Sequence, residues 1–245
     1  MPDITIAGLT PFSMVDWPGR LVATVFTKGC SWNCPYCHNP GLRGTTADSE
    51  KVPWEEVTGL ARRRRGLLDG FVFSGGEPTR QRGLPAAIRQ VRELGFAVGL
   101  HTNGMYPALL ARILDRQLVD WVGLDIKAAP QPAAYGQAIG ASSFAAAERA
   151  AGRAWRSLEL LQAAGCDFEV RTTVFDCPEQ LRTLPKLADQ LADAGVDNWV
   201  LQRSRGQGTA AGFCGAADVV KHERAVAISD AIATARRNFP DVAVR

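Results

Sequence analysis

Residues 21–40 read Leu21-Val-Ala-Thr-Val-Phe-Thr27-Lys28-Gly-Cys30-Ser-Trp-Asn-Cys34-Pro-Tyr-Cys37-His-Asn-Pro40. The first seven residues form a short apolar run that is typical of a buried parallel strand. The rest of the stretch is polar and carries three cysteines within eight residues. The stretch therefore predicts a strand whose C-terminal end leads directly into a loop with candidate functional residues.

The alternation of strand and polar loop recurs along the chain. Apolar runs predict further strands at Gly70–Ser74, Phe96–His101, Trp121–Ile126, Phe168–Val174 and Asn198–Gln202. Helical spacing of apolar residues occurs between them, at Pro53–Arg65, Leu84–Leu94, Pro107–Gln117, Phe144–Ala164, Pro178–Ala194 and Val219–Phe239. Proline near helix starts and glycine after helix ends support these boundaries. Strand followed by helix, six times over, predicts an α/β fold with a parallel sheet and right-handed crossovers.

The positions of the polar motifs distinguish two α/β architectures. At or just after predicted strand ends lie Lys28–Cys37, Ser74–Pro78, His101–Gly104, Asp125–Lys127, Arg171–Thr173 and Gln202–Arg203. A doubly wound open sheet concentrates its site at one switch point, whereas a barrel collects polar groups from every strand end. We therefore expect a partial (β/α)6 barrel of the TIM type. We expect residues 1–245 to form one domain, with an N-terminal hairpin at about 1–20, a barrel core at about 21–205 and a C-terminal helical segment at about 206–245.

Composition and charge exclude several classes of protein. Apolar residues at 46% and charged residues at 22% are ordinary for a soluble globular protein. No apolar run approaches the roughly 18 residues of a membrane span, and Met1–Thr10 lacks the features of a secretory signal, so we expect a cytoplasmic protein. The net charge of +3 does not by itself indicate a nucleic-acid partner. The one charge run, Arg62–Arg65, is either a solvated helix end or a docking patch for an acidic surface.

The three clustered cysteines leave more than one interpretation open. A structural zinc site needs four protein ligands, and the adjacent residue His38 would be a strained partner for Cys37. A 4Fe–4S cluster with three cysteine ligands leaves one iron open for a substrate, which a four-cysteine electron-transfer cluster does not. Unligated thiols are the third possibility. The other cysteines show no ligand-like spacing and are expected to be small buried residues; they are Cys166, Cys177 and Cys214.

The cysteine spacing resembles a known family. Cys-x3-Cys-x2-Cys with an aromatic residue before the last cysteine, followed by Ser74-Gly-Gly-Glu-Pro78 after the second strand, is similar to the radical S-adenosylmethionine superfamily. The resemblance implies a partial (β/α)6 barrel and one 4Fe–4S cluster whose open iron binds the amino and carboxylate groups of S-adenosylmethionine. The implied iron ligands are Cys30, Cys34 and Cys37.

The resemblance also implies contacts with S-adenosylmethionine. Tyr36 would lie against the adenine, and Thr102 and Asn103 would meet the ribose hydroxyls. The turn Gly75-Gly76-Glu77 would receive the methionyl amino group, because glycines let the backbone approach closely and a carboxylate partners an ammonium. Without the cysteine motif, this turn would read as a simple strand-to-helix connection.

Further segments are similar to one branch, the activating enzymes of glycyl radical enzymes, in particular the anaerobic ribonucleoside-triphosphate reductase activating protein family. They are Phe12–Gly19, Cys37–Pro40, His101–Gly104, Asp125–Lys127, Tyr135–Gly140 and Val170–Val174, and the resemblance covers roughly residues 5–205. Many such activators carry an eight-cysteine insert before the Gly-Gly-Glu turn. Residues 38–73 contain no cysteine, so we do not expect a second cluster.

This branch implies an oxidoreductase that receives one electron from a flavodoxin or ferredoxin. It would install a glycyl radical on a partner such as an anaerobic ribonucleotide reductase or pyruvate formate-lyase. The residues implied to meet the substrate are Asp16, Asp125, Lys127 and Arg171. Structural alternatives are a hairpin cap for Asp16, a mutual pair for Asp125 and Lys127, and a barrel-rim anchor for Arg171. A radical enzyme acting on a small molecule or peptide, such as a deazaguanine synthase, and a non-catalytic iron–sulfur carrier or sensor remain alternative functions.

Overall fold

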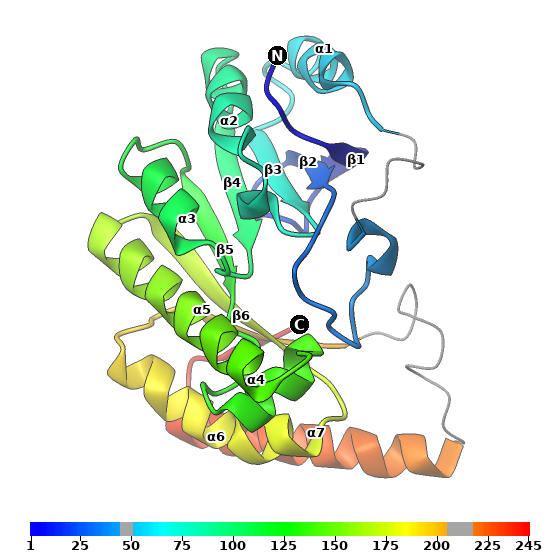
Figure 1. The fold of residues 1–245 in the computed structure, drawn as a ribbon, viewed down its shortest axis with the longest axis vertical. Helices are drawn as coiled ribbons and strands as arrows, with labels where there is room; N and C mark the ends of the chain where they lie inside the picture. Colours follow the sequence, from blue (N-terminus) through cyan, green and yellow to red (C-terminus); the bar gives the residue numbers. More distant parts are fainter. Residues whose placement is uncertain (45–50, 205–217) are drawn as a thin grey trace. The chain divides into compact units, whose positions relative to one another are not determined.

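The structure is a computed structural model that describes residues 1–44, 51–204 and 218–245 (Figure 1). Its strands are β1 (Ile6–Ser13), β2 (Val22–Thr27), β3 (Gly70–Gly75), β4 (Ala97–Thr102), β5 (Trp121–Asp125), β6 (Asp167–Val174), β7 (Trp199–Arg203) and β8 (Ala243–Val244). Its helices are α1 (Trp54–Arg63), α2 (Leu84–Glu93), α3 (Pro107–Leu114), α4 (Pro132–Ile139), α5 (Phe144–Ala164), α6 (Pro178–Asp193) and α7 (Asp218–Asn238), with short 3-10 turns at Pro40–Leu42 and Pro78–Arg80.

The strands of the described residues form an eight-stranded sheet in sequence order, with β1 and β8 at its two ends. β1 runs antiparallel to β2, with Ile6 opposite Thr27 and Ser13 opposite Val22. From β2 to β5 the neighbours are parallel, as are β6, β7 and β8. The predicted α/β partial barrel is confirmed. Every predicted strand and helix is present, with ends that differ by at most three residues.

Besides the two short 3-10 turns, α4 and β8 were not predicted, and β1 was predicted only as part of an N-terminal hairpin at about 1–20. β1, α4 and β8 contain no long apolar run from which the sequence would predict them. The N-terminal hairpin is therefore formed by β1 and β2 and extends past residue 20 to Thr27. β6 ends at Val174, as predicted, so the motif Arg171–Thr173 lies within the second half of the strand.

The chain divides into two compact units that interleave along the sequence. The first contains Met1–Ser31, Gly41–Leu124 and Arg156–Phe168, and the second contains Trp32–Pro40, Asp125–Trp155 and Glu169–Arg245. The expectation of a single domain over residues 1–245 stays a prediction. Of its predicted C-terminal segment, α7 and β8 are described, and residues 206–217 lie outside the described ranges.

The core of the first unit is organised around Trp17, on the connection between β1 and β2. Its indole stacks on that of Trp121, with ring centroids 5.6 Å apart, and packs with Val22 and Val72. A Cβ atom at Gly99 of β4 would lie 2.9 Å from the Trp17 ring. The absence of a side chain at this position therefore makes room for the indole. Trp17 itself is 6% exposed.

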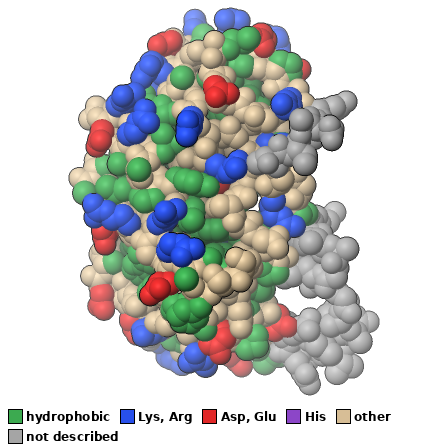
Figure 2. All heavy atoms as spheres, in the orientation of Figure 1, with side chains coloured by type: hydrophobic (Ala, Val, Ile, Leu, Met, Phe, Trp, Pro, Cys, Tyr) green, Lys and Arg blue, Asp and Glu red, His purple; other side chains and the backbone are tan. Residues whose placement is uncertain are grey.

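The basic run at the end of α1 is surface-exposed. Arg62 and Arg63 form the last turn of α1, and Arg65 donates to the Leu94 carbonyl at the end of α2. A cationic side chain at a helix C-terminus is favoured by the helix dipole, which agrees with the interpretation of a solvated helix end. On the face drawn in Figure 2, basic side chains are interspersed with acidic and apolar ones. No helix in the described residues is long and apolar enough to cross a membrane.

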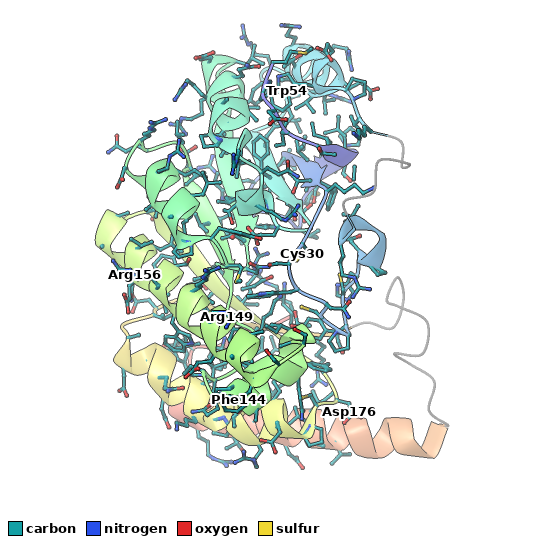
Figure 3. All side chains as sticks on the ribbon, in the orientation of Figure 1. Cys30, Trp54, Phe144, Arg149, Arg156 and Asp176 are labelled. Carbon is teal, nitrogen blue, oxygen red and sulfur yellow. The ribbon has the colours of Figure 1, made fainter. Side chains whose placement is uncertain are left out.

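We predict that Trp17→Ala destabilises the protein by about 3–5 kcal/mol, because it removes a buried indole and leaves a cavity beside Trp121. Urea unfolding followed by circular dichroism measures the change. Phe144→Ala is the matched control, since Phe144, labelled on α5 in Figure 3, has 67% of its surface exposed. Its effect should stay below about 1 kcal/mol. Equal effects of the two substitutions would contradict the assigned core.

Candidate functional site

The cysteine loop follows β2 and is divided between the two units. Cys30, labelled in Figure 3, belongs to the first unit, and Cys34 and Cys37 belong to the second. In the first unit the backbone N–H of Cys30 donates to the Arg43 carbonyl at 3.0 Å. Gly29 donates to the Leu42 carbonyl at 2.7 Å and has a positive φ of 97°, which favours glycine. These bonds fix the entry to the cysteine loop.

The Gly-Gly-Glu turn lies directly against this entry. A Cβ atom at Gly75, whose φ is 119°, would lie 2.3 Å from the Thr27 backbone. A Cβ atom at Gly76 would lie 2.5 Å from the Gly29 carbonyl oxygen. The Glu77 N–H donates to that same carbonyl at 2.9 Å. The two glycines are therefore required for the close approach of two loops, besides any contact with a cofactor.

The Glu77 carboxylate is buried and accepts hydrogen bonds from protein donors on both oxygens. Oε1 accepts from the Thr79 N–H at 2.9 Å, from the Thr79 hydroxyl and from the Thr102 hydroxyl at 2.7 Å, while Oε2 accepts from the Asn103 N–H at 2.7 Å. The residue is 1% exposed. Burial raises the pKa of this carboxyl above its usual value, and the hydrogen bonds oppose the rise. The carboxylate thus holds the end of β4, a role that the sequence did not reveal.

The hydrogen bonds around Glu77 already occupy groups that were predicted to contact S-adenosylmethionine. Binding of the methionyl ammonium by the Glu77 carboxylate would add to, or exchange with, donors that are already in place. Thr102 is 3% exposed, and its hydroxyl also accepts from the Gly104 N–H at 3.1 Å. Asn103 is 5% exposed and accepts from the Met105 N–H. The ammonium contact of Glu77 and the ribose contacts of Thr102 and Asn103 stay predictions.

Asp16 is held by residues of β2 and β4, the two strands that flank β3 in the first unit. Its carboxylate accepts from the Thr24 hydroxyl of β2 at 2.6 Å. Its backbone carbonyl lies 2.6 Å from Nε2 of His101, and Nδ1 of His101 lies 3.1 Å from the Ser74 hydroxyl. Because a carbonyl only accepts, Nε2 carries a proton, and in the neutral imidazole Nδ1 accepts from Ser74. His101 and Ser74 are positioning residues that the sequence placed inside motifs without assigning them a role.

The second unit brings the predicted charged residues together. Nζ of Lys127 lies 2.8 Å from Oδ2 of Asp125, so the proposed mutual pair is formed. Nε of Arg171 lies 3.8 Å from Oδ1 of Asp125 and 3.9 Å from Oε1 of Glu169. Burial alone would lower the pKa of Lys127, but Asp125 and then Cys34 outweigh it, and the net pKa is raised. Lys127 therefore stays cationic although only 8% of it is exposed.

Tyr36 packs inside the second unit. Its ring centroid lies 4.6 Å from that of Phe175, and Nζ of Lys127 lies 5.5 Å from the ring centroid. Burial, followed by the nearby Cys34 and Asp125, raises the pKa of the Tyr36 hydroxyl well above its usual value. The residue is 3% exposed, so stacking on an adenine would require its present neighbours to move. The adenine contact stays a prediction.

One further residue of this unit was missed by the sequence analysis. Gln180, in the first turn of α6, is 0% exposed. Its Nε2 donates to the Lys127 carbonyl at 2.7 Å and to the Thr173 carbonyl at 2.9 Å. The side chain thereby ties the segment after β5 to the end of β6. A glutamine in a helical stretch gives no sequence signal of such a role.

The cysteine environment fits a thiolate-bound iron–sulfur cluster. Cys30, Cys34 and Cys37 are present as thiols, and soft sulfur ligands suit iron–sulfur clusters. Burial raises the pKa of the Cys34 thiol to about 11, while the Lys127 ammonium acts in the opposite sense and favours the thiolate. Among the described residues, no three His, Cys, Asp or Glu side chains are grouped to hold a single metal ion. Ligation by the three cysteines stays a prediction.

Comparison with known proteins gives one family match. The family described as the Radical SAM superfamily matches residues 24–176, which is more than half of the chain. A Methanocaldococcus jannaschii protein with the provisional name of a glycyl-radical enzyme activating enzyme, MJ1227, is 34% identical over 128 residues, 50% of this chain and 50% of that protein. The PqqA peptide cyclase of Xanthomonas euvesicatoria is 31% identical over 143 residues, 55% of this chain and 38% of the cyclase. The chain thus spans about half or less of the length of these relatives.

Solved structures share the fold at low sequence identity. Streptococcus suis SuiB bound to its precursor peptide SuiA superposes with a TM-score of 0.59 and 13% identity over 91% of this chain and 48% of SuiB. The protein anSMEcpe with bound AdoMet gives a TM-score of 0.52 and 16% identity over 73% of this chain and 48% of that chain. At such identities the likeness establishes the fold alone.

We predict that Cys34→Ala abolishes the 4Fe–4S absorption and electron paramagnetic resonance spectra of anaerobically purified protein, because it removes one of the three predicted iron ligands. The parent should hold about four irons per chain. Cys166→Ala is the matched control and should retain both iron and spectrum, since Cys166 lies on the turn between α5 and β6 with its thiol near the Val119 carbonyl. An iron content near eight, or loss of the spectrum in the Cys166 variant, would show that the ligand assignment is incomplete.

We predict that Glu77→Gln lowers the free energy of unfolding by about 1–3 kcal/mol, because an amide nitrogen would face one of the N–H or O–H donors that now meet a carboxylate oxygen. Urea unfolding of the protein measures the change. Glu56→Gln, on the exposed first turn of α1, should change stability by less than about 1 kcal/mol. A Glu77 variant as stable as the parent would mean that the network does not contribute to the fold.

Proposed function

Because this chain belongs to the Radical SAM superfamily, whose members use a 4Fe–4S cluster and S-adenosylmethionine, we propose that it is an activating enzyme that installs a glycyl radical on a partner protein. The observation that carries this proposal is the similarity to relatives that have provisional names as glycyl-radical enzyme activating enzymes, from Methanocaldococcus jannaschii and Haemophilus influenzae. These relatives are 29–34% identical over half or less of the chain. The identity of the target protein is therefore also part of the proposal.

The proposal assigns the cysteines to the cluster and the radical chemistry to the cluster and its cofactor. Cys30, Cys34 and Cys37 would hold three irons of the cluster. When bound, the cluster and S-adenosylmethionine supply a 5′-deoxyadenosyl radical, and the electron that this requires would come from a flavodoxin or ferredoxin. The chain's contribution is to bind, to orient and to exclude water. A glycine Cα is a suitable target because it has no side chain and is flanked by two amides.

The charged residues would position cofactor and substrate. Asp16 is half-buried, and a carboxylate has lone pairs beyond the one that accepts from Thr24, so it can accept an N–H of an incoming glycine loop. In the second unit Lys127 and Arg171 provide cations, and Asp125 provides a carboxylate, which suits a zwitterionic amino acid group.

A second function is favoured by a specific observation. The similarity to PqqA peptide cyclase, 31% identical over 143 residues, supports a radical enzyme that acts on a peptide. Both functions place a polypeptide at the site, and they differ in the product. An activating enzyme leaves a stable radical on its partner, whereas a cyclase leaves a new covalent bond. An electron carrier would cleave no S-adenosylmethionine at all.

The test is electron paramagnetic resonance of the reduced protein mixed with S-adenosylmethionine and a candidate partner, either an anaerobic ribonucleotide reductase or pyruvate formate-lyase. We predict a doublet that collapses when the partner carries α-deuterated glycine, because the doublet arises from the remaining α-hydrogen. The Cys34→Ala variant is the negative control and should give no radical.

Asp16→Asn provides a sharper control for the same experiment. It should retain the cluster and lower the radical yield about tenfold, in line with the loss of roughly 1.4 kcal/mol of one charge-assisted hydrogen bond. Asp115→Asn, on the exposed turn after α3, should behave as the parent. Formation of 5′-deoxyadenosine with a peptide or small molecule, and no protein radical with either partner, would move the assignment to another branch.

A further inference from the structure

The side chain of Asn103 meets the sulfur of Cys30. Nδ2 of Asn103 lies 3.7 Å from Sγ of Cys30, within the range of an N–H···S hydrogen bond. Both residues belong to the first unit: Asn103 directly follows β4, and Cys30 lies three residues after the end of β2. Asn103 is 5% exposed, so its amide is largely withdrawn from water.

The orientation of the amide is determined by its other contacts. Oδ1 accepts the Met105 N–H at 3.0 Å, and only the oxygen of the amide can accept. The nitrogen must therefore be the atom that faces Cys30. The backbone of Asn103 is fixed in addition by its N–H, which donates to Oε2 of Glu77 at 2.7 Å. The Glu77 N–H in turn donates to the Gly29 carbonyl, one residue before Cys30.

We infer that Asn103 is a positioning residue that raises the reduction potential of the cluster through its hydrogen bond to the Cys30 thiolate. The inference rests on Cys30 as an iron ligand and does not require a glycyl radical partner. A donor to a ligand sulfur withdraws electron density from the thiolate and stabilises the added negative charge when the cluster takes up one electron. No proton is transferred, so the step changes only the oxidation state of the cluster.

This role differs from the ribose contact that the sequence implied for Asn103. A ribose contact would alter the affinity for S-adenosylmethionine and leave the potential of the cofactor-free cluster unchanged. A hydrogen bond to Cys30 would instead shift the reduction potential of the cluster even when no S-adenosylmethionine is bound. The two roles can therefore be separated by one measurement on the protein without the cofactor.

The experiment is an anaerobic redox titration of the protein with its cluster, using dithionite and mediator dyes and following the reduced cluster by electron paramagnetic resonance. Asn103→Ala should retain about four irons per chain. At a fixed potential its ratio of reduced to oxidised cluster should be about tenfold lower than that of the parent, which for a one-electron couple corresponds to a midpoint potential about 59 mV more negative. Asn198→Ala, at an exposed loop position directly before β7, is the matched control and should titrate as the parent.

Asn103→Asp covers the case in which the alanine variant does not hold the cluster. It keeps an acceptor for the Met105 N–H, loses the donor to Cys30 and should also lower the midpoint. An unchanged midpoint in the variants that hold the cluster would overturn the inference, whether or not S-adenosylmethionine binding weakens. Loss of the cluster from both variants would overturn it too, because a tuning hydrogen bond is not needed for assembly.

Discussion

The buried carboxylate of Glu77 is the interaction on which the first unit depends. A carboxylate withdrawn from water is costly unless donors surround it, and here they come from Thr79, Thr102 and Asn103. Its own N–H reaches the Gly29 carbonyl beside Cys30. One residue thus joins segments that are separated by tens of residues in the chain. The lack of a side chain at Gly76 follows from the same contact, because the two loops approach too closely for a Cβ atom.

The second unit differs from the first in that several charged side chains are clustered and largely buried within it. Arg245 near the chain end makes a two-pronged contact with Glu169 at 3.1 and 3.0 Å, and Glu169 is 1% exposed. Arg171 lies between Glu169 and Asp125, and Lys127 pairs with Asp125. These five residues carry three positive and two negative charges. The excess of positive charge suits a unit that also contains Cys34, where Lys127 favours the thiolate.

The sequence predicted the parallel strands and their helices because buried strands are short apolar runs and helices show a clear period. It predicted an N-terminal hairpin but not the bounds of β1, whose middle residues are half-buried or exposed, and it missed α4, which is short and rich in alanine. It located the polar residues at strand ends but not their partners. Glu77 meets Thr102 and Asn103 through the register of β3 and β4, and no local pattern encodes which donors a carboxylate will find. Arg245 pairs with Glu169 across 76 residues for the same reason.

The ends of β3 and β4 serve two parts of the first unit at once. Ser74 and His101 hold the backbone of Asp16, and the residues that directly follow them, Gly75 to Glu77 and Thr102 to Asn103, form the network beside Cys30. The segment proposed to meet the substrate and the loop proposed to hold the cluster are therefore anchored to the same two strands. A displacement of either strand end would move both. Rigid packing at this point couples the position of a substrate contact to the position of a cluster ligand without a separate device.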